Sequence, residues 1–200
     1  LCNIAEPDLG IITNIGKAHL EGFGSIEGVR QGKGELYDYL AREGKPVLIN
    51  TDDSVLREMA DARGLLGVAY GMDAGAQIHG TIITTKPYIN GLVSIEGEEF
   101  QLSTHMPGAY NFMNMLAAIA AGVYFEIAPE KMVRLLSNYS SDNNRSQIAE
   151  GKSNTLLLDA YNANPTSMEA SLEDFVSGEE QNQGNRGEPT KGIIKGAHDQ

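Results

Sequence analysis

The sequence contains little cysteine, little positive charge and no long apolar run, and each shortage disfavours a class of protein. Its single cysteine, Cys2, cannot form an internal disulfide, so we expect no disulfide framework and a cytoplasmic location. With 15 basic against 27 acidic residues the net charge is −12, which disfavours nucleic-acid binding. The longest apolar run, 115–125, is well short of the roughly 20 residues of a membrane helix, so we expect no membrane insertion.

The two common nucleotide-binding loops are also missing from these residues. The segment Gly32-Lys33-Gly34 fails the P-loop pattern G-x-x-x-x-G-K-S/T, because Glu27 replaces the leading glycine and Gly34 replaces the hydroxyl residue. No strand-like run is followed by G-x-G-x-x-G. The residues alone therefore predict an α/β fold with a possible ligand site at a sheet edge, and no more.

What is present is an alternation of apolar strands and amphipathic helices, which is typical of a parallel α/β sheet. The expected strands are 10–15, 46–50 and 65–70, and the expected helices are 25–42, capped by Ser25, and a helix ending at 63, capped by Asp52 or Asp53. From 77 to 103 three short segments rich in Ile, Thr and Val indicate a small antiparallel meander. Pro107 and Pro129 are expected to begin two further helices, to about 125 and 136.

A polar linker at 140–144 indicates a domain boundary. Beyond it, 146–150 and 155–158 are expected to be strands, and Pro165 to begin a helix. We therefore expect segments at 1–142, at 143–175, and a polar tail at 176–200 that buries too little apolar surface to fold. Leu1 is no initiator and the opening residues resemble the end of a helix, so we expect an internal piece of a longer protein.

Lys33 is the most informative single candidate for chemistry. It lies on the apolar stripe of the 25–42 helix, four residues after Val29 and three before Leu36. The ordinary interpretation is a lysine whose stem packs while its ammonium reaches solvent. The alternative is a partly desolvated amine with a lowered pKa, able to take up carbon dioxide and become a carbamate that binds metal.

The other candidates each have a structural and a functional interpretation. His19, after the first strand, is either solvated or a magnesium ligand. Asn111 and Asn114, one turn apart, either cap and face solvent or offer two amides to a purine edge or a phosphate. Arg145 is a surface cation or a phosphate clamp, and Asp159 is an ordinary strand-end acid or a ligand group.

Five blocks, in order along the chain, resemble those of the Mur ligase family. The family patterns include A-K-G-E, G-x-H-N-x-x-N-x-L-A-A and G-R-x-Q, and an acidic turn D-S-Y-N-A-N-P-x-S-M. The matching segments here are ITNIGKAHLE at 12–21, QGKGEL at 31–36, PGAYNFMNMLAA at 107–118, NNRSQ at 143–147 and DAYNANPTSM at 159–168. This chain departs from the patterns at Gly32, where alanine is usual, at Tyr110, where histidine is frequent, and at Asn144, where glycine is usual.

The resemblance covers about residues 1–175 and implies both a fold and a site. The implied fold is α/β: a partial central ATPase domain with a mainly parallel sheet plus a small antiparallel sheet, then the first strands and helix of a Rossmann-like C-terminal domain. The implied roles are magnesium binding by His19 and carbamylated Lys33, ATP contacts by Asn111, Asn114 and Asn162, phosphate contact by Arg145 and ribose contact by Asp159. The family's P-loop, metal-binding glutamate and UDP-binding domain would precede Leu1, so we expect the 200 residues alone to be inactive.

The turn at 159–168 also indicates a branch of the family. It resembles the branch that adds D-alanyl-D-alanine, and differs from the D-x-A-H-N-P type turn of folylpolyglutamate synthases. The implied reaction uses ATP to phosphorylate UDP-N-acetylmuramoyl-tripeptide, and D-alanyl-D-alanine then attacks the acyl phosphate, in peptidoglycan precursor synthesis. An inactive fragment and a folate-type ligase stay open as alternatives, and the sequence does not indicate an oligomeric state.

Overall fold

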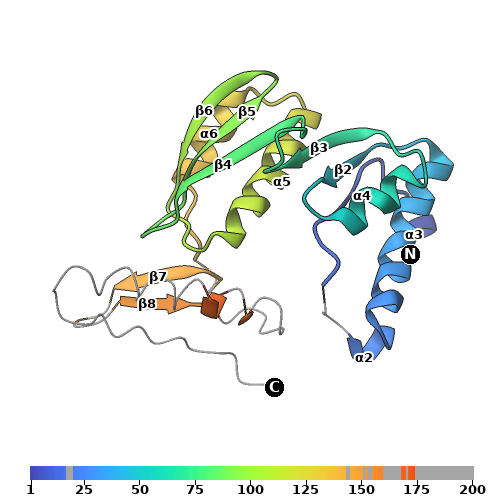
Figure 1. The fold of residues 1–200 in the computed structure, drawn as a ribbon, viewed down its shortest axis with the longest axis horizontal. Coiled ribbons are helices and arrows are strands. Elements are labelled where there is room, and N and C mark those ends of the chain that lie inside the picture. The colour runs from blue at the N-terminus through green and yellow to red at the C-terminus, as the bar shows by residue number, and fades with distance from the viewer. Residues whose placement is uncertain are drawn as a thin grey trace.

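A computed structural model describes residues 1–16, 20–142, 145–150, 152, 155–159, 168–169 and 171–173 (Figure 1). The helices are α1 (Cys2–Ala5), α2 (Leu20–Phe23), α3 (Ile26–Glu43), α4 (Ser54–Asp61), α5 (Tyr110–Tyr124) and α6 (Pro129–Asn138). The strands are β1 (Gly10–Ile12), β2 (Val47–Asn50), β3 (Gly67–Gly71), β4 (Ile78–Thr84), β5 (Asn90–Ile95), β6 (Glu98–Ser103), β7 (Gln147–Glu150) and β8 (Thr155–Leu158). Within the described ranges, no helix is both long and apolar enough to span a lipid bilayer.

The first six strands form one sheet in the order β1-β2-β3-β4-β5-β6. β1 to β4 pair in parallel, and β4 to β6 pair antiparallel, so the predicted α/β fold with its parallel and antiparallel parts is confirmed. The sequence did not indicate that the two parts are continuous. They are joined by two residue pairs only, Tyr70 with Ile78 and Gly71 with His79, so β4 belongs to both parts.

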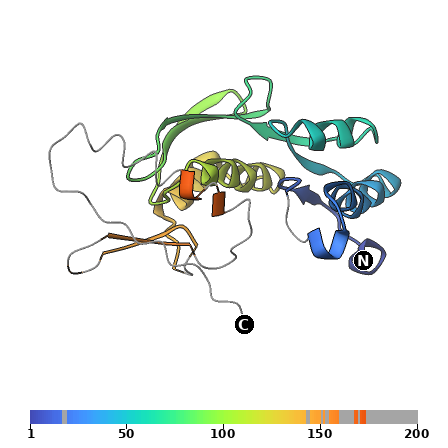
Figure 2. The same cartoon turned by 60° about the horizontal axis from the view of Figure 1, so that its bottom comes forward.

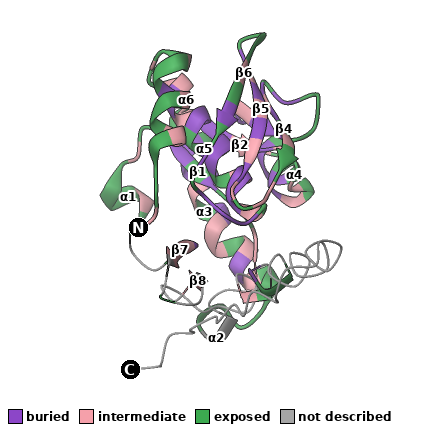
Figure 3. Cartoon of the chain, turned by 90° about the vertical axis from the view of Figure 1, so that its left-hand side faces the viewer, coloured by how far each residue is buried: buried purple, intermediate pink, exposed green. Residues whose placement is uncertain are grey.

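Helices cover both faces of this sheet, and β2 shows how. Val47 and Ile49 pack with residues of α3 and α4, whereas Leu48 packs with residues of α5 on the opposite face. This alternation follows from the two-residue period of a strand. Figure 2 shows α5 and α6 lying beneath β4 to β6, and Figure 3 shows that α5 is largely buried there. The sheet is therefore the middle layer between two apolar cores.

Two predicted helix starts are confirmed by their caps. The Ser25 side chain accepts a hydrogen bond from Gly28 N at 3.0 Å, and Asp53 accepts from Val55 N and Leu56 N at 3.0 and 3.1 Å. Asp52, the other candidate cap, instead accepts hydrogen bonds from the backbone N–H of Met72 at 3.0 and 2.8 Å. The two adjacent acids therefore have separate structural roles.

Two element boundaries predicted from the sequence were wrong. α5 begins at Tyr110 and not at Pro107, because Gly108 adopts φ 83° and interrupts the helix. β1 ends at Ile12 and not at Ile15, and the carbonyls of Thr13 and Asn14 accept hydrogen bonds from side chains. Each error amounts to only three residues. The type of element was predicted correctly, but the first residue of α5 and the last residue of β1 were not.

The described residues after 142 form a separate two-stranded antiparallel sheet, in which β7 pairs with β8 (Figure 1). The predicted strands are confirmed, and residues 168–169 and 171–173 are helical, as expected for the segment after Pro165. The predictions for Asn162 and for the tail at 176–200 lie outside the described residues. The division at 142 remains a prediction.

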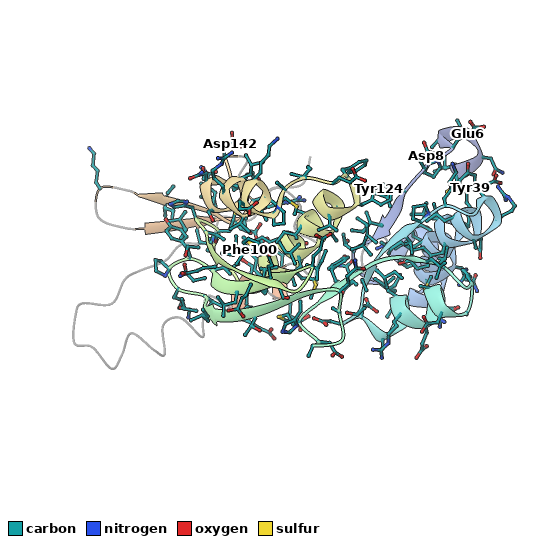
Figure 4. All side chains as sticks on the ribbon, turned by 90° about the horizontal axis from the view of Figure 1, so that it is seen from above. Glu6, Asp8, Tyr39, Phe100, Tyr124 and Asp142 are labelled. Atoms are coloured by element: carbon teal, nitrogen blue, oxygen red, sulfur yellow. The ribbon has the colours of Figure 1, made fainter. Side chains whose placement is uncertain are left out.

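At the other end of the molecule, α1 lies beside α3. Figure 4 shows Glu6, Asp8 and Tyr39 together there. Lys45, just after α3, forms an ion pair with Asp8 at 2.7 Å. Because Asp8 is largely exposed, this pair contributes little to stability, and it serves mainly to fix the approach to β1.

Candidate nucleotide and metal site

The loop that follows β1 is held by side chains from three elements. Lys33 Nζ on α3 donates to Asn14 O at 2.9 Å, and Asn50 Nδ2 at the end of β2 donates to Thr13 O at 3.2 Å. Asp53, the cap of α4, accepts from Ile15 N at 3.4 Å. These contacts fix the backbone immediately before residues 17–19. His19 lies outside the described residues, so the predicted pairing of His19 with Lys33 remains a prediction.

Lys33 is half-buried, and burial shifts its protonation equilibrium toward the neutral amine. Burial lowers its pKa, and the nearby Asp53 carboxylate opposes that shift. A lysine with a lowered pKa has a larger fraction of free amine at neutral pH, and only the free amine is nucleophilic. The direction of the shift agrees with the chemical interpretation of Lys33 and disagrees with a fully solvated ammonium.

Asp53 was missed as a site residue because the sequence showed it only as a helix cap. Two buried tyrosines, Tyr37 and Tyr70, lie close enough to be affected by its charge. Burial, and then Asp53, raise the pKa of Tyr37 to about 12, whereas burial, then Tyr37 and then Asp53 raise the pKa of Tyr70. Within the described part of the chain, neither phenol has a hydrogen-bond partner. Asp53 therefore lies beside groups of low polarity, and this strengthens the electrostatic attraction between its carboxylate and the Lys33 ammonium.

The departure from the family pattern at Gly32 has a steric explanation. A methyl group at this position would overlap the ring of Phe23, the last residue of α2. The absence of a side chain at Gly32 lets α2 lie directly against α3, one residue before Lys33. The small residue therefore positions α2 close to the lysine.

The described residues alone do not make a complete metal site. No group of three His, Cys, Asp or Glu side chains capable of holding a metal occurs among them. Lys33, as a carbamate, would supply the oxygen ligand that magnesium prefers, but both Asp53 oxygens already accept backbone hydrogen bonds. The fit to magnesium therefore depends on Lys33 and on residues beyond the described ranges.

The two asparagines of α5 lie on one helix face, as predicted, and are joined to each other. Asn114 Nδ2 donates to Asn111 Oδ1 at 3.2 Å, and Asn111 Nδ2 donates to Pro107 O at 2.8 Å. Asn111 is buried and so holds the turn that precedes α5, whereas Asn114 is exposed. Of the pair, Asn114 is the one placed to meet a ligand directly.

Asp159, at the end of β8, lies against the first turn of α5. Tyr110 Oη donates to Asp159 Oδ2 at 3.3 Å and lies 2.7 Å from Ser146 Oγ. Ser146 directly follows Arg145, which is exposed. The structure thus brings Arg145, Asn111 and Asp159 to one region, through a tyrosine whose only signal in the sequence was that it replaces a frequent histidine.

The Lys33 region, on α3, and the Tyr110 region, on α5, belong to helices on opposite faces of the six-stranded sheet, and each lies near a segment placed below that sheet. In Figures 1 and 3, α2 and the β7–β8 sheet both lie below it. One region offers an amine beside a carboxylate, and the other offers an amide, a guanidinium and a carboxylate. This is a set of groups suited to a ligand carrying phosphate, ribose and metal.

Comparison with known proteins agrees with this geometry. A family described as the Mur ligase middle domain matches residues 1–122. A UDP-N-acetylmuramoyl-tripeptide–D-alanyl-D-alanine ligase of Bacillus subtilis is 34% identical over 183 residues, covering 86% of this chain and 37% of the relative. A UDP-N-acetylmuramate–L-alanine ligase of Desulforamulus reducens is 28% identical over 173 residues, covering 85% of this chain and 37% of that relative.

A solved structure supports the fold. MurF ligase from Thermotoga maritima in complex with ADP superimposes with a TM-score of 0.75 at 21% identity, covering 88% of this chain and 40% of that one. The chain thus spans well under half the length of the curated relatives it matches. From the match over residues 1–122 and the shared fold, the chain belongs to the Mur ligase family, and residues 1–122 correspond to its middle domain.

Proposed function

We propose that these residues belong to an ATP-dependent amide ligase that adds D-alanyl-D-alanine to UDP-N-acetylmuramoyl-tripeptide in the cytoplasm. The observation that carries the proposal is the position of Asp159, at the start of the D-A-Y-N-A-N-P-T-S-M turn, against Tyr110 at the start of α5. The turn indicates the branch of the family, and the contact joins it to the region expected to bind ATP. The name of the Bacillus subtilis relative supports the same branch.

The proposed roles follow from the chemistry of each side chain. Asn114 would contact ATP from the exposed face of α5, with Asn111 holding it in place through their hydrogen bond. Arg145 would bind phosphate oxygens through its planar guanidinium. Asp159 would accept hydrogen bonds from ribose hydroxyls, and Asn162 would contact the nucleotide from the same turn. ATP would then lie between residues 1–142 and the segment that begins at 143.

Magnesium would be held by His19 and by the carbamate of Lys33. The bound ion would neutralise part of the phosphate charge. The lowered pKa of Lys33 favours the free amine that takes up carbon dioxide. Catalysis would then consist mainly of positioning the tripeptide carboxylate for phosphorylation and the dipeptide amine for attack. The acyl phosphate would lose phosphate as the new amide forms.

The test is phosphate release by the complete protein that contains these residues. We expect release that requires both UDP-N-acetylmuramoyl-tripeptide and D-alanyl-D-alanine, and that falls to background in Lys33→Ala. Release with L-alanine and UDP-N-acetylmuramate, or with folate and glutamate, would place the protein in another branch. No release with any of these substrates would overturn the proposal.

We further propose that the 200-residue chain alone turns over no ATP, because no P-loop occurs in it to supply backbone donors to the phosphates. Its ATPase rate should equal that of its own Lys33→Ala variant. A rate above that control would show that the side chains named above suffice for turnover and would overturn this proposal.

A further inference from the structure

Tyr110 connects two parts of the chain that are far apart in sequence. Its phenol oxygen lies 2.7 Å from Ser146 Oγ and 3.3 Å from Asp159 Oδ2, at sequence separations of 36 and 49 residues. Tyr110 is the first residue of α5, whereas Ser146 precedes β7 and Asp159 follows β8. Because Gln147 pairs with Leu158 in the antiparallel ladder, Ser146 and Asp159 lie at the same end of the β7–β8 sheet, and one hydroxyl bonds to both strands there.

The direction of these hydrogen bonds follows from the number of protons. An ionised carboxylate only accepts, so Tyr110 donates its single proton to Asp159. Tyr110 must then accept from Ser146, whose hydroxyl donates. Burial is the main cause that raises the pKa of Tyr110, so the phenol keeps its proton at neutral pH and remains a donor.

Ser146 has a conformation that only a compensating contact would maintain. It is 1% exposed and its φ is 48°, in the left-handed region that favours glycine. Such a conformation costs a non-glycine residue free energy, and it persists where surrounding contacts determine it. The 2.7 Å hydrogen bond to Tyr110 is such a contact.

We propose that Tyr110 is a positioning residue that fastens the β7–β8 sheet to α5 and orients Asp159 toward the nucleotide. The part concerning the nucleotide rests on the proposed function. The fastening itself is independent of any ligand, because both hydrogen bonds form between side chains of this chain. The bond to Asp159 uses Oδ2 alone and, at 3.3 Å, is long for an O–H donor, so it orients the carboxylate without holding it tightly.

Hydrogen exchange of the 200-residue chain tests the fastening. In Tyr110→Phe we expect amides of β7 and β8 to exchange several-fold faster while amides of β4 and β5 keep their wild-type rates, because a hydrogen bond worth about 1 kcal/mol changes a local opening equilibrium roughly five-fold. Ser146→Ala should give the same pattern. Tyr70→Phe is the matched control, since it also removes a buried phenol hydroxyl, one with no partner among the described residues.

Unchanged rates in β7 and β8 of Tyr110→Phe would overturn the proposal. A rise shared equally by β4 and β5 would also overturn it, because Tyr110 would then be an ordinary core residue. Tyr70→Phe should leave all four strands at their wild-type rates.

Nucleotide kinetics of the complete protein test the orientation of Asp159. We expect Tyr110→Phe to raise KM for ATP about three- to ten-fold with a smaller change in kcat, because the phenol touches Asp159 and not the reacting atoms. If KM for ATP is unchanged while β7 and β8 exchange faster, Tyr110 does not orient Asp159. Its role in fastening the β7–β8 sheet to α5 would still hold. Failure of the wild-type protein to use ATP would count against the proposed function, and the exchange experiment would still decide the fastening.

Discussion

Replacing Asp53 separates its role as a helix cap from its role as a charge. Its carboxylate caps α4 through Val55 N and Leu56 N, accepts Ile15 N, and raises the pKa of Lys33 against the effect of burial. Asp53→Ala removes all of these functions. Asp53→Asn keeps an oxygen for the cap, because asparagine caps as well as aspartate, but it removes the charge.

The expected loss of stability follows from these contacts. Losing the cap costs about 1 kcal/mol. Losing the acceptor for Ile15 N costs roughly 0.5 kcal/mol, the low end for a hydrogen bond, because the distance is 3.4 Å. At about 2–4 °C per kcal/mol for a chain of this size, Asp53→Ala should lower Tm by about 3–6 °C and Asp53→Asn by about 1–2 °C.

Thermal unfolding followed by circular dichroism measures the first effect, and NMR titration of the Lys33 side chain measures the second. Both variants should lower the pKa of Lys33 further, because each removes the carboxylate that raises it. Asp61→Ala, at the last residue of α4, is the control: an acid there opposes the helix dipole, so its removal should not destabilise. Equal melting temperatures for Asp53→Asn and Asp53→Ala, or an unchanged Lys33 pKa, would refute this account of Asp53.

Three further outcomes are expected. Gly108→Ala should destabilise by about 1–2 kcal/mol in urea unfolding, because φ is 83°, whereas Gly75→Ala, with no positive φ, should stay within about 0.5 kcal/mol. Relative to Lys33→Met, the free energy of unfolding of the wild type should increase as pH rises from the lowered Lys33 pKa toward 10.5, since the unfolded chain binds more protons there. Relative to Lys45→Met, it should decrease as pH rises from 10.5 through the raised Lys45 pKa, because the hydrogen bond to Asp8 raises that pKa in the folded chain. Arg145→Ala in the complete protein should lose most turnover with little change in Tm without nucleotide, and wild-type turnover would make Arg145 a surface residue.

The sequence predicted the features that depend on local pattern. The alternation of strands and helices, the cap by Ser25 and the Ile- and Val-rich meander were all confirmed, because period, capping and turn chemistry act over a few residues. The early end of β1 was missed because side chains of Lys33 and Asn50, from elements 19 and 37 residues away, take the carbonyls that would have continued the strand. Nothing in residues 13–16 themselves encodes that outcome.

The same limit applies to the site. Lys33 could be selected from its place on an apolar stripe, which is a local signal. The contribution of Asp53 to Lys33 and that of Tyr110 to Asp159 are contacts between distant segments. His19 and Asn162 lie outside the described residues, so their roles remain predictions.

The two departures from the family pattern near the site become understandable only with their neighbours. At Gly32 a methyl group would overlap the Phe23 ring as it lies here, and Tyr110 is matched by Ser146, whose hydroxyl donates to the phenol. An imidazole is shorter than a phenol, so a histidine at 110 would not reach both Ser146 and Asp159 from the same backbone position. Each unusual residue therefore depends on one contacting residue, Gly32 on Phe23 and Tyr110 on Ser146. Restoring the usual family residue alone would disturb that contact. A position that fits the family pattern poorly can for this reason belong to the working site, provided that its contacts account for the difference.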